Sequence, residues 1–432
     1  MSKTTYIATG DSFITRRIPA GGYDGYQPMA ELIKSHDVAF NNLEMTFHDR
    51  EGVPAAVSGG TWAMADPRIL DDIKAMGFNL FNTANNHSCD YSHGGVLATI
   101  RHLKERDMIF SGTGKDLGDA SKPCYFEAGG QRVALISVCA SFDVSAMAGE
   151  QSADMQGRPG LNPLRWKYIY HLDQPHFDAI VETARVTRIN AERERDIAAG
   201  YFNPPAEGTT VLGSFSFVLD DHNWIESVPD ERDMTRIEAE IREAAKQADV
   251  VLVSLHAHET DADDTTVPAR FSETFSRRCI DAGAKVMIGH GPHEVRGIEL
   301  YHGGVIFYSL GNFIFQTETV EYQPADAYSN KGVPLTTKVG EYMDIRSKNS
   351  TVGYIAMKEI WEAIAASWTI EDGSIKEVRL YPVGLGFGAR RPQGGWPVLS
   401  QDEEFLQRLA VLCKPYGTEL KIENGCATLV LS

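Results

Sequence analysis

Residues 249–256 read DVVLVSLH, and residues 285–293 read KVMIGHGPH. Each stretch is an apolar run of strand length that leads into histidine, and apolar side chains recur at helical spacing between the two stretches. Strand, helix and strand in this order predict a βαβ unit whose two strands run parallel in one sheet. Because the carboxyl ends of parallel strands meet at one edge, we expect His256, His290 and His293 to face a common site.

The same alternation of strands and helices runs through the first 140 residues. The clearest helical pattern opens on Asp66-Pro67, an N-cap followed by proline at the first helical position, and ends at Gly77. The predicted strands are Tyr6–Thr9, Val38–Phe40, Asn79–Thr83 and Arg132–Cys139. This order of elements predicts an α/β fold with a mainly parallel sheet.

A segment of different composition interrupts this pattern. Residues 141–231 are richer in proline, glycine and charge, and they contain a long polar helical stretch, so we predict a largely helical insertion that covers a site. The alternation resumes in residues 232–316, which form the second half of the domain begun by residues 1–140. For residues 317–432 the pattern predicts only a C-terminal extension that packs on the core.

The composition excludes some classes of partner and site. There are 41 Lys and Arg against 59 Asp and Glu, and a formal charge of −18 repels polyanions, so we expect no nucleic-acid partner. No apolar run approaches the about 20 residues that cross a bilayer, and the polar Asp11 comes too early for a secretory signal. We therefore expect a cytoplasmic protein without a membrane partner. The six cysteines show no C-x-x-C pairing, which argues against a thiolate zinc site.

Five predicted strands are followed by side chains that can bind metal ions. These are Asp11, Glu44, the pair Asn86 and His87, His256, and the pair His290 and His293. A single strand-end carboxylate is more often a helix cap or turn residue, but five strand ends of this kind are hard to explain as caps. Carboxylate oxygen and imidazole nitrogen are ligands of Zn, Mn and Fe, and a carboxylate can bridge two ions. The pattern predicts a centre with two divalent metal ions.

Several short motifs follow one another in a fixed order. They are Gly10-Asp11, Asn42-Leu43-Glu44, Ala84-Asn85-Asn86-His87 with Asp90 behind it, Leu255-His256, Gly289-His290-Gly291-Pro292-His293 and Tyr308-Ser309-Leu310-Gly311-Asn312-Phe313. This set resembles the CapA-like family of capsule-synthesis, or poly-γ-glutamate-synthesis, proteins, which belong to the calcineurin-like metallophosphatase superfamily. The resemblance extends from residue 10 to about residue 315. It implies a four-layer α/β/β/α sandwich, in which two sheets pack between layers of helices.

The resemblance also implies a role for each motif residue. It places Asp11 and His293 on one metal ion, Asn86, His256 and His290 on the other, and Glu44 between the two. His87 would be an acid or orienting group beside the metals, assisted by Asp90. One position departs from the phosphatases, which open with Asp-x-His: here Phe13 stands in place of the histidine, so the occupancy of the first metal position stays open.

The sequence signals for substrate-binding residues are weaker than those for metal ligands. Arg158 and Arg165 lie on a loop limited by proline, and guanidinium groups bind carboxylate or phosphate through paired hydrogen bonds. The same two arginines could equally tie the loop to neighbouring carboxylates. His258 departs from the pattern of related chains and is expected to line the pocket. The expected substrate is a small-molecule or peptide-like anion, and the oligomeric state stays open.

Three functions remain open from the sequence. With metal ions bound, the site would be a hydrolase of a phosphoester or of a γ-glutamyl amide, with His87 protonating the leaving group. Without metal ions, Asp11 and His293 could remove and return a proton, as in a metal-independent peptide epimerase. The third is a non-catalytic accessory protein of polymer synthesis. We expect the hydrolase.

Overall fold

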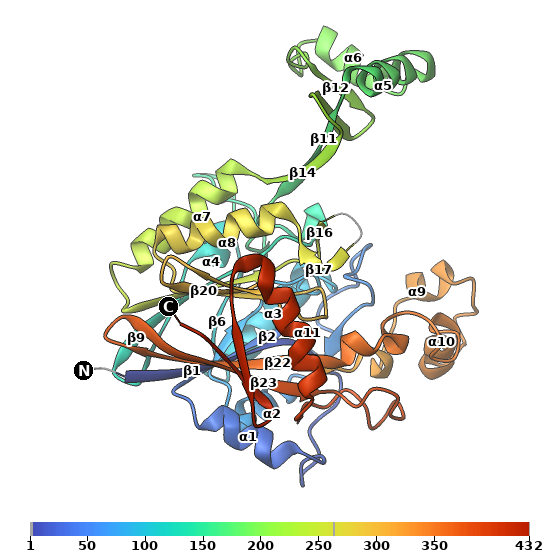
Figure 1. Ribbon diagram of the computed structural model, residues 1–432. Coiled ribbons are helices and arrows are strands. Elements are labelled where there is room, and N and C mark those ends of the chain that lie inside the picture. Colours follow the sequence, from blue (N-terminus) through green and yellow to red (C-terminus); the bar gives the residue numbers. More distant parts are fainter. Residues whose placement is uncertain (1–2, 262–263, 432) are drawn as a thin grey trace.

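The computed structural model describes residues 3–261 and 264–431 and has two large β-sheets in its body (Figure 1). Within these residues the larger sheet has ten strands and the smaller sheet has six. Helices pack against both sheets, and a narrow arm projects from the body. The predicted α/β class is confirmed.

The larger sheet is built on the N-terminal strands of the chain. The parallel part consists of β1 (Lys3–Phe13), β2 (Val38–Leu43), β5 (Leu80–Asn82) and β6 (Ile109–Ser111). Asp11 lies near the end of β1, and Glu44 directly follows β2, so both carboxylates come to the carboxyl edge of this sheet. The short β21 (Asn312–Phe315) pairs with β1 at the same edge.

The C-terminal extension supplies the other half of the larger sheet. Strand β22 (Glu362–Glu371) runs antiparallel to β1, and β23 (Ser374–Gly384) pairs with β22. The remaining strands are β24 (Val398–Leu399), β25 (Leu420–Glu423) and β26 (Cys426–Leu429). Trp368 on β22 is buried and stacks on Tyr6 of β1, with 5.4 Å between ring centroids. The extension therefore completes the sheet, a stronger involvement than packing on a finished core.

The smaller sheet contains the βαβ unit that the histidine-bearing stretches predict. Its strands, in spatial order, are β19 (Ile298–Tyr301), β20 (Gly304–Phe307), β18 (Val286–His290), β15 (Val250–His256), β9 (Gln131–Cys139) and β8 (Cys124–Ala128). Helix α8 (Arg270–Ala282) connects β15 to β18, and the two strands are parallel. Their register pairs His256 with His290, which places both imidazoles at one edge.

Three apolar clusters join the sheets and helices. In the first, α1 (Tyr26–Lys34) and α2 (Ile69–Met76) pack on the larger sheet, with Ile33, Ile73 and Ala39 among the buried residues. In the second, strands of both sheets meet, with Phe40 and Leu252 among the buried residues. In the third, α7 (Glu231–Ala244) and α8 pack on the smaller sheet. Each helix presents its apolar stripe to a sheet, as its sequence spacing predicts.

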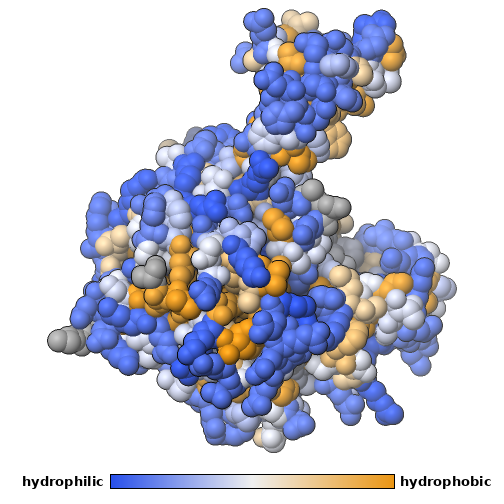
Figure 2. All heavy atoms as spheres, viewed as in Figure 1, coloured by the Kyte–Doolittle hydropathy of each residue, from blue (hydrophilic) through white to orange (hydrophobic). Residues whose placement is uncertain are grey.

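Residues 166–229 form the arm that projects from the body (Figure 1). It contains β11 (Trp166–Leu172), α5 (Gln174–Thr187), α6 (Ala191–Ala198), β12 (Thr209–Leu212), β13 (Phe215–Leu219) and β14 (Trp224–Pro229). The sequence predicts a largely helical insertion, but the arm also contains a sheet. The short strands of this sheet pair with one another and not with the strands of the body. Most of the arm's surface is hydrophilic in the view of Figure 2.

The arm differs from the predicted insertion in its extent. Residues 141–165 stay with the body, where β10 (Gly160–Leu161) pairs with β7 (Thr113–Gly114). Within the described ranges, every helix is too short or too polar to span a bilayer.

Candidate metal centre

Six polar side chains from both sheets lie at the carboxyl ends of the strands. They come from β1 (Asp11), the residue after β2 (Glu44), the turn after β5 (Asn86), the last residues of β15 and β18 (His256 and His290), and the turn after β18 (His293). Asp11, Glu44 and His256 are fully buried. His293 adopts a left-handed backbone conformation with φ of 64°, which turns the chain back toward the site.

The carboxylate and imidazole atoms lie at distances that suit shared metal ions. Asp11 Oδ1 is 3.7 Å from His256 Nδ1 and 3.6 Å from His290 Nδ1. Glu44 Oε1 is 3.7 Å from His256 Nε2 and 3.8 Å from His293 Nε2. Two ligand atoms, each about 2.0–2.2 Å from one ion, can lie up to about 4.4 Å apart, so these pairs are compatible with a common ion.

Among the described residues, three groups of acidic and histidine side chains could each hold a metal ion. They are Asp11 with His256 and His290, Glu44 with His256 and His258, and Asp11 with Glu44 and His293. His258, which the sequence suggested as a pocket residue, therefore also qualifies as a ligand. Its Nε2 lies 3.1 Å from His256 Nε2, and burial together with neighbouring imidazoles lowers the pKa of His258 well below its usual value.

Hydrogen bonds around the site fix the orientation of these side chains. Asn312 Nδ2 donates to the carbonyl groups of His293 and Ile360, so its Oδ1 accepts from His293 Nδ1 at 2.8 Å. His293 Nε2 is then left with the lone pair that a metal needs, and this atom faces Glu44. Ser254 Oγ contacts His290 Nε2 at 2.7 Å in the same way, on the side away from Asp11.

The carboxylate of Asp11 is also held from two sides. Asn42 Nδ2 donates to its Oδ1 at 2.7 Å, and the backbone N–H of Gly291 donates to its Oδ2 at 3.0 Å. Burial nevertheless raises the pKa of Asp11 to about 7. Burial lowers the pKa of His290 to about 3 and that of His293 to about 4, so both imidazoles are neutral and can act as ligands.

The carboxylate of Glu44 has no hydrogen-bond partner among the residues that the structure describes. Both of its carboxylate oxygens are buried without a hydrogen bond, and burial together with nearby Asp11 raises the pKa of Glu44 well above its usual value. Asn86 Oδ1 is also buried and unbonded, while Asn86 Nδ2 donates to the carbonyl of Gly59 at 3.0 Å. Buried polar atoms are rarely left unpaired, and a carboxylate least of all. The residues present therefore fit a bound cation.

His87 stands beside this cluster, oriented by Asp90. His87 Nδ1 lies 2.6 Å from Asp90 Oδ2, and Asp90 also accepts the backbone N–H groups of Gly59 and Ala63 at 3.0 and 2.7 Å. Phe13, which stands where the phosphatases carry a histidine ligand, is fully buried and meets the His87 ring edge-on, with centroids 5.1 Å apart.

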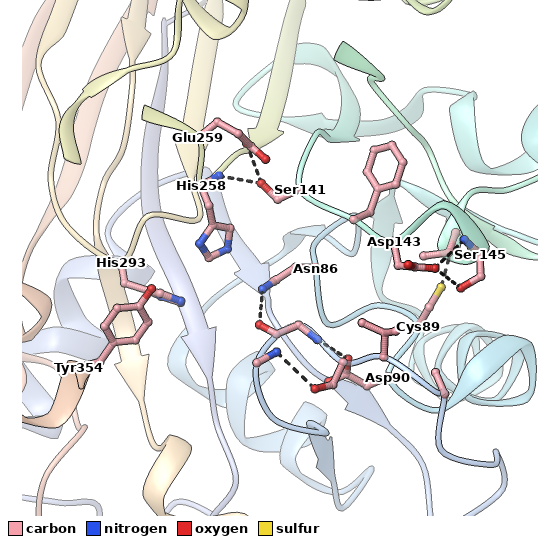
Figure 3. Close-up of a pocket in the computed structure, with 17 residues that line it drawn as sticks. Asn86, Cys89, Asp90, Ser141, Asp143, Ser145, His258, Glu259, His293 and Tyr354 are labelled. Carbon is pink, nitrogen blue, oxygen red and sulfur yellow. Dashed lines mark hydrogen bonds between the residues drawn. The ribbon is translucent and has the colours of Figure 1, made fainter. Parts of the chain in front are cut away.

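A cavity of about 420 Å³ opens next to the metal-binding groups (Figure 3). His293 and Tyr354 line one side, and Asp143 and Ser145 line the opposite side. Tyr354, from the short 3₁₀ helix η3 (Tyr354–Ala356), has its ring centroid 5.1 Å from that of His293. No motif pointed to Tyr354. The bond from Asn312 to His293, in contrast, belongs to the Tyr308–Phe313 motif and could have been sought there.

The two arginines suggested for substrate binding lie elsewhere. The Arg165 guanidinium makes two hydrogen bonds to Asp233, at 2.7 and 2.9 Å, and Arg158 Nε donates to the carbonyl of Met147 at 2.9 Å. Neither is among the described residues that line the cavity. The structure thus brings Arg165 to a neighbouring carboxylate, the alternative that the sequence left open.

The sequence matches the model of the family described as bacterial capsule synthesis protein PGA_cap over residues 5–317. The chain belongs to this family. The CapA-like membership predicted from the motifs is confirmed, and all six predicted metal ligands lie within the matched span. Tyr354 lies outside it.

Curated relatives of this PGA_cap chain differ in how much of it they match. An uncharacterized protein of Sinorhizobium fredii, y4sH, is 32% identical over 97% of this chain and 91% of its own length. Capsule biosynthesis protein CapA of Bacillus anthracis is 26% identical over 72% of this chain and 60% of its own length. The PGA biosynthesis protein CapA of Bacillus subtilis is 24% identical over 70% of this chain and 62% of its own length.

Proposed function

We propose that this PGA_cap protein is a metal-dependent hydrolase of a small or peptide-like anionic substrate, either a phosphoester or a γ-glutamyl or peptide amide. The observation that carries the proposal is Glu44, a fully buried carboxylate that receives no hydrogen bond from the described part of the chain. Its neighbours within 3.8 Å include imidazole nitrogens of His256 and His293. A divalent cation is the partner that this combination of atoms lacks.

We also propose that the body is the four-layer α/β/β/α sandwich of the metallophosphatases. Three observations support the assignment: one apolar cluster lies between the two sheets, one joins α1 and α2 to the larger sheet, and one joins α7 and α8 to the smaller sheet. In that architecture, ligands from two sheets meet at the shared carboxyl edge, which suits a centre built from both.

The proposed centre holds two divalent ions. One would be bound by Asp11, Glu44 and His293, and the other by His256 and His290 with Asp11 or with the Oδ1 of Asn86. Mixed nitrogen and oxygen ligands suit Mn, Zn or Fe. When bound, such ions supply a hydroxide at neutral pH and stabilise the negative charge that develops on a phosphoryl or carbonyl oxygen.

Residues of the protein itself would then donate the proton and line the site. Asp90 holds His87 Nδ1, so the free Nε2 is the atom from which a leaving group could take a proton. The Tyr354 ring meets the His293 ring edge-on at the cavity wall, where it can limit the access of water to the site.

The metal-independent epimerase is less well supported. It would need Asp11 and His293 both to reach a substrate carbon. Asp11 is fully buried and is not among the described residues that line the cavity, whereas His293 is. Asp11 is therefore better placed to hold an ion beneath the substrate than to touch the substrate.

Metal content and hydrolysis together test the proposal. Protein purified without chelator should contain Mn, Zn or Fe and should cleave 4-nitrophenyl phosphate or γ-glutamyl-4-nitroanilide, and a chelator should abolish the cleavage until metal is returned. Glu44→Gln should lose bound metal and at least about 100-fold in activity, because removing one member of such a unit disables it. Glu259→Gln is the matched control, since the Glu259 carboxylate lines the cavity but already accepts a hydrogen bond from Ser141 at 2.8 Å.

Two results would count against the hydrolase. The first is wild-type protein that binds no divalent metal and shows no cleavage with metal added. The second is deuterium uptake at a peptide α-carbon that chelation leaves unchanged and that Asp11→Asn abolishes, because that pattern belongs to the epimerase.

A further inference from the structure

A second, smaller cavity of about 110 Å³ adjoins the one described above. The two cavities share Gly59, Gly60, His293 and Tyr354 as lining residues. His87 and Phe13 also line the smaller cavity, so the proposed proton donor faces this side. A substrate whose reacting bond lies over His293 would therefore extend from one cavity into the other.

Arg346, the last residue of α10 (Val339–Arg346), lines the smaller cavity and is half-buried. Among the described residues that line the two cavities, it is the one arginine or lysine. The larger cavity, in contrast, has the carboxylates of Asp143 and Glu259 in its wall. Away from the metal ligands, the positive charge of the combined cleft is thus concentrated at Arg346.

The charge of Arg346 is not taken up by a neighbouring carboxylate. Glu318 lines the same cavity, but it and Asp344 pair with Arg391, at 3.0 and 2.7 Å. Arg346 makes no ion pair within 4.0 Å among the residues that the structure describes, although its charge helps to lower the pKa of Glu318 against the effect of burial. Arg165 differs, because it is paired with Asp233, and Arg158 differs because it does not line either cavity.

We propose that Arg346 binds an oxyanion of the substrate, a carboxylate or a phosphate that is not the group being cleaved. A guanidinium presents paired donors that match either oxyanion, and a half-buried, unpaired one gains most from such a partner. The proposal rests on the proposed function for the position of the reacting bond. It adds a specificity-determining residue from the C-terminal extension, outside the residues 5–317 that the family model matches.

Calorimetric titration of chelator-treated full-length protein tests this without relying on catalysis or on bound metal. The probes are γ-glutamylglutamate, which carries carboxylates away from its amide, and inorganic phosphate. Arg346→Gln should weaken binding of one probe about tenfold or more, the range expected for a lost hydrogen bond to a charged group. Arg346→Lys should recover part of the loss, because lysine keeps the charge without the paired donors. Arg158→Gln is the matched control and should bind like wild type.

The outcomes separate the possibilities. A loss confined to γ-glutamylglutamate identifies a carboxylate as the ligand, and a loss confined to phosphate identifies a phosphate. Equal affinities in wild type and in Arg346→Gln, or no binding of either probe to the wild type, overturn the proposal even if the protein proves to be a hydrolase. Conversely, if the protein binds a probe through Arg346 but cleaves no substrate, the proposal of an anion site stands and the proposal of a hydrolase is wrong. In an active enzyme, Arg346→Gln should raise KM about tenfold or more and change kcat less than about threefold.

Discussion

At the scale of single residues, the contact of Asp90 with His87 makes a direct prediction for activity. The Asp90→Asn variant should lower kcat by about 10- to 100-fold, because the amide cannot hold the His87 imidazole in one tautomer or stabilise its protonated form. KM should change less than kcat, since the hydrogen bonds of the Asp90 carboxylate to described residues go to His87 and to backbone N–H groups. Steady-state kinetics on the best substrate from the hydrolase assay measures both quantities.

Asp143→Asn provides the comparison for that variant. Asp143 lines the same cavity but accepts hydrogen bonds from Ser145 and not from His87. A similar fall in kcat for the two variants would mean that the cavity responds to lost charge in general, and His87 would then lose its assigned role.

His48 gives a prediction for the dependence of stability on pH. Its side chain is buried, its Nε2 has no hydrogen-bond partner within residues 3–261 and 264–431, and burial lowers the pKa of His48 to about 4. Because an unfolded histidine has a pKa of about 6.5, the unfolded state takes up the proton first as the pH falls, so stability decreases between about pH 6.5 and pH 4. The contribution of His48 at pH 5 should be a loss of about 2 kcal/mol relative to pH 7.

Urea unfolding of the His48→Gln variant at pH 7 and pH 5 measures this contribution. The variant should lose less stability than wild type on acidification, since glutamine keeps an acceptor for the Glu51 N–H without a proton to gain. His302→Gln, at an exposed imidazole, should keep the wild-type slope. Identical slopes for all three proteins would assign the acid sensitivity to other groups.

At the scale of elements, the arm is attached to the body by the base of one hairpin. Trp166 stacks on Phe271, with ring centroids 4.8 Å apart, and Ser227 Oγ accepts from the Phe271 N–H at 3.1 Å. Beyond this base, β11 and β14 pair with each other, with Tyr170 opposite Ile225. The outer part of the arm therefore depends on the base for its position, and it contacts a helix of the body through Trp224, whose ring lies 5.3 Å from the Arg270 guanidinium of α8.

Removal of the outer arm should leave the body folded. Replacing residues 171–224 by Asn-Gly closes the hairpin at Tyr170 and Ile225 with a favoured two-residue turn. We expect metal content to stay as in wild type, with Tm lower by only a few degrees, as measured by circular dichroism and elemental analysis.

Trp166→Ala in the full chain should lower the free energy of unfolding by about 2 kcal/mol, because it removes an aromatic contact at the base. An aggregated or metal-free excision variant would show that the arm belongs to the folding unit.

At the scale of the whole molecule, strands from the two ends of the chain complete one sheet. A chain ending at residue 317 would lose β22 and leave the backbone of β1 as an unprotected sheet edge. We expect such a chain to be insoluble, although it contains the matched family span and all six predicted metal ligands.

Within the full chain, Trp368→Ala should lower the free energy of unfolding by about 3–5 kcal/mol, whereas Phe387→Ala, at a half-exposed ring, should lower it by less than about 1 kcal/mol. A soluble, metal-binding chain of 317 residues would contradict this view.

The strand–helix–strand order and the polar residues at the strand ends can be predicted from the amino-acid sequence. These signals are local, because the spacing of apolar residues fixes an element and parallel pairing carries the strand ends to one edge. That is why Asp11, Glu44, His256, His290 and His293 could be expected together before their distances were known.

Tertiary structure alone decided the rest. The pairing of β22 with β1 joins residues more than 300 positions apart, and no periodicity in either stretch specifies its partner. Tyr354 and Arg346 reach the cavities from an extension without motifs, and Glu318 and Asp344 pair with Arg391, so that Arg346 has no ion-pair partner among the described residues. Such contacts depend on which surfaces remain free once the sheets have packed, and that information is distributed over the entire chain.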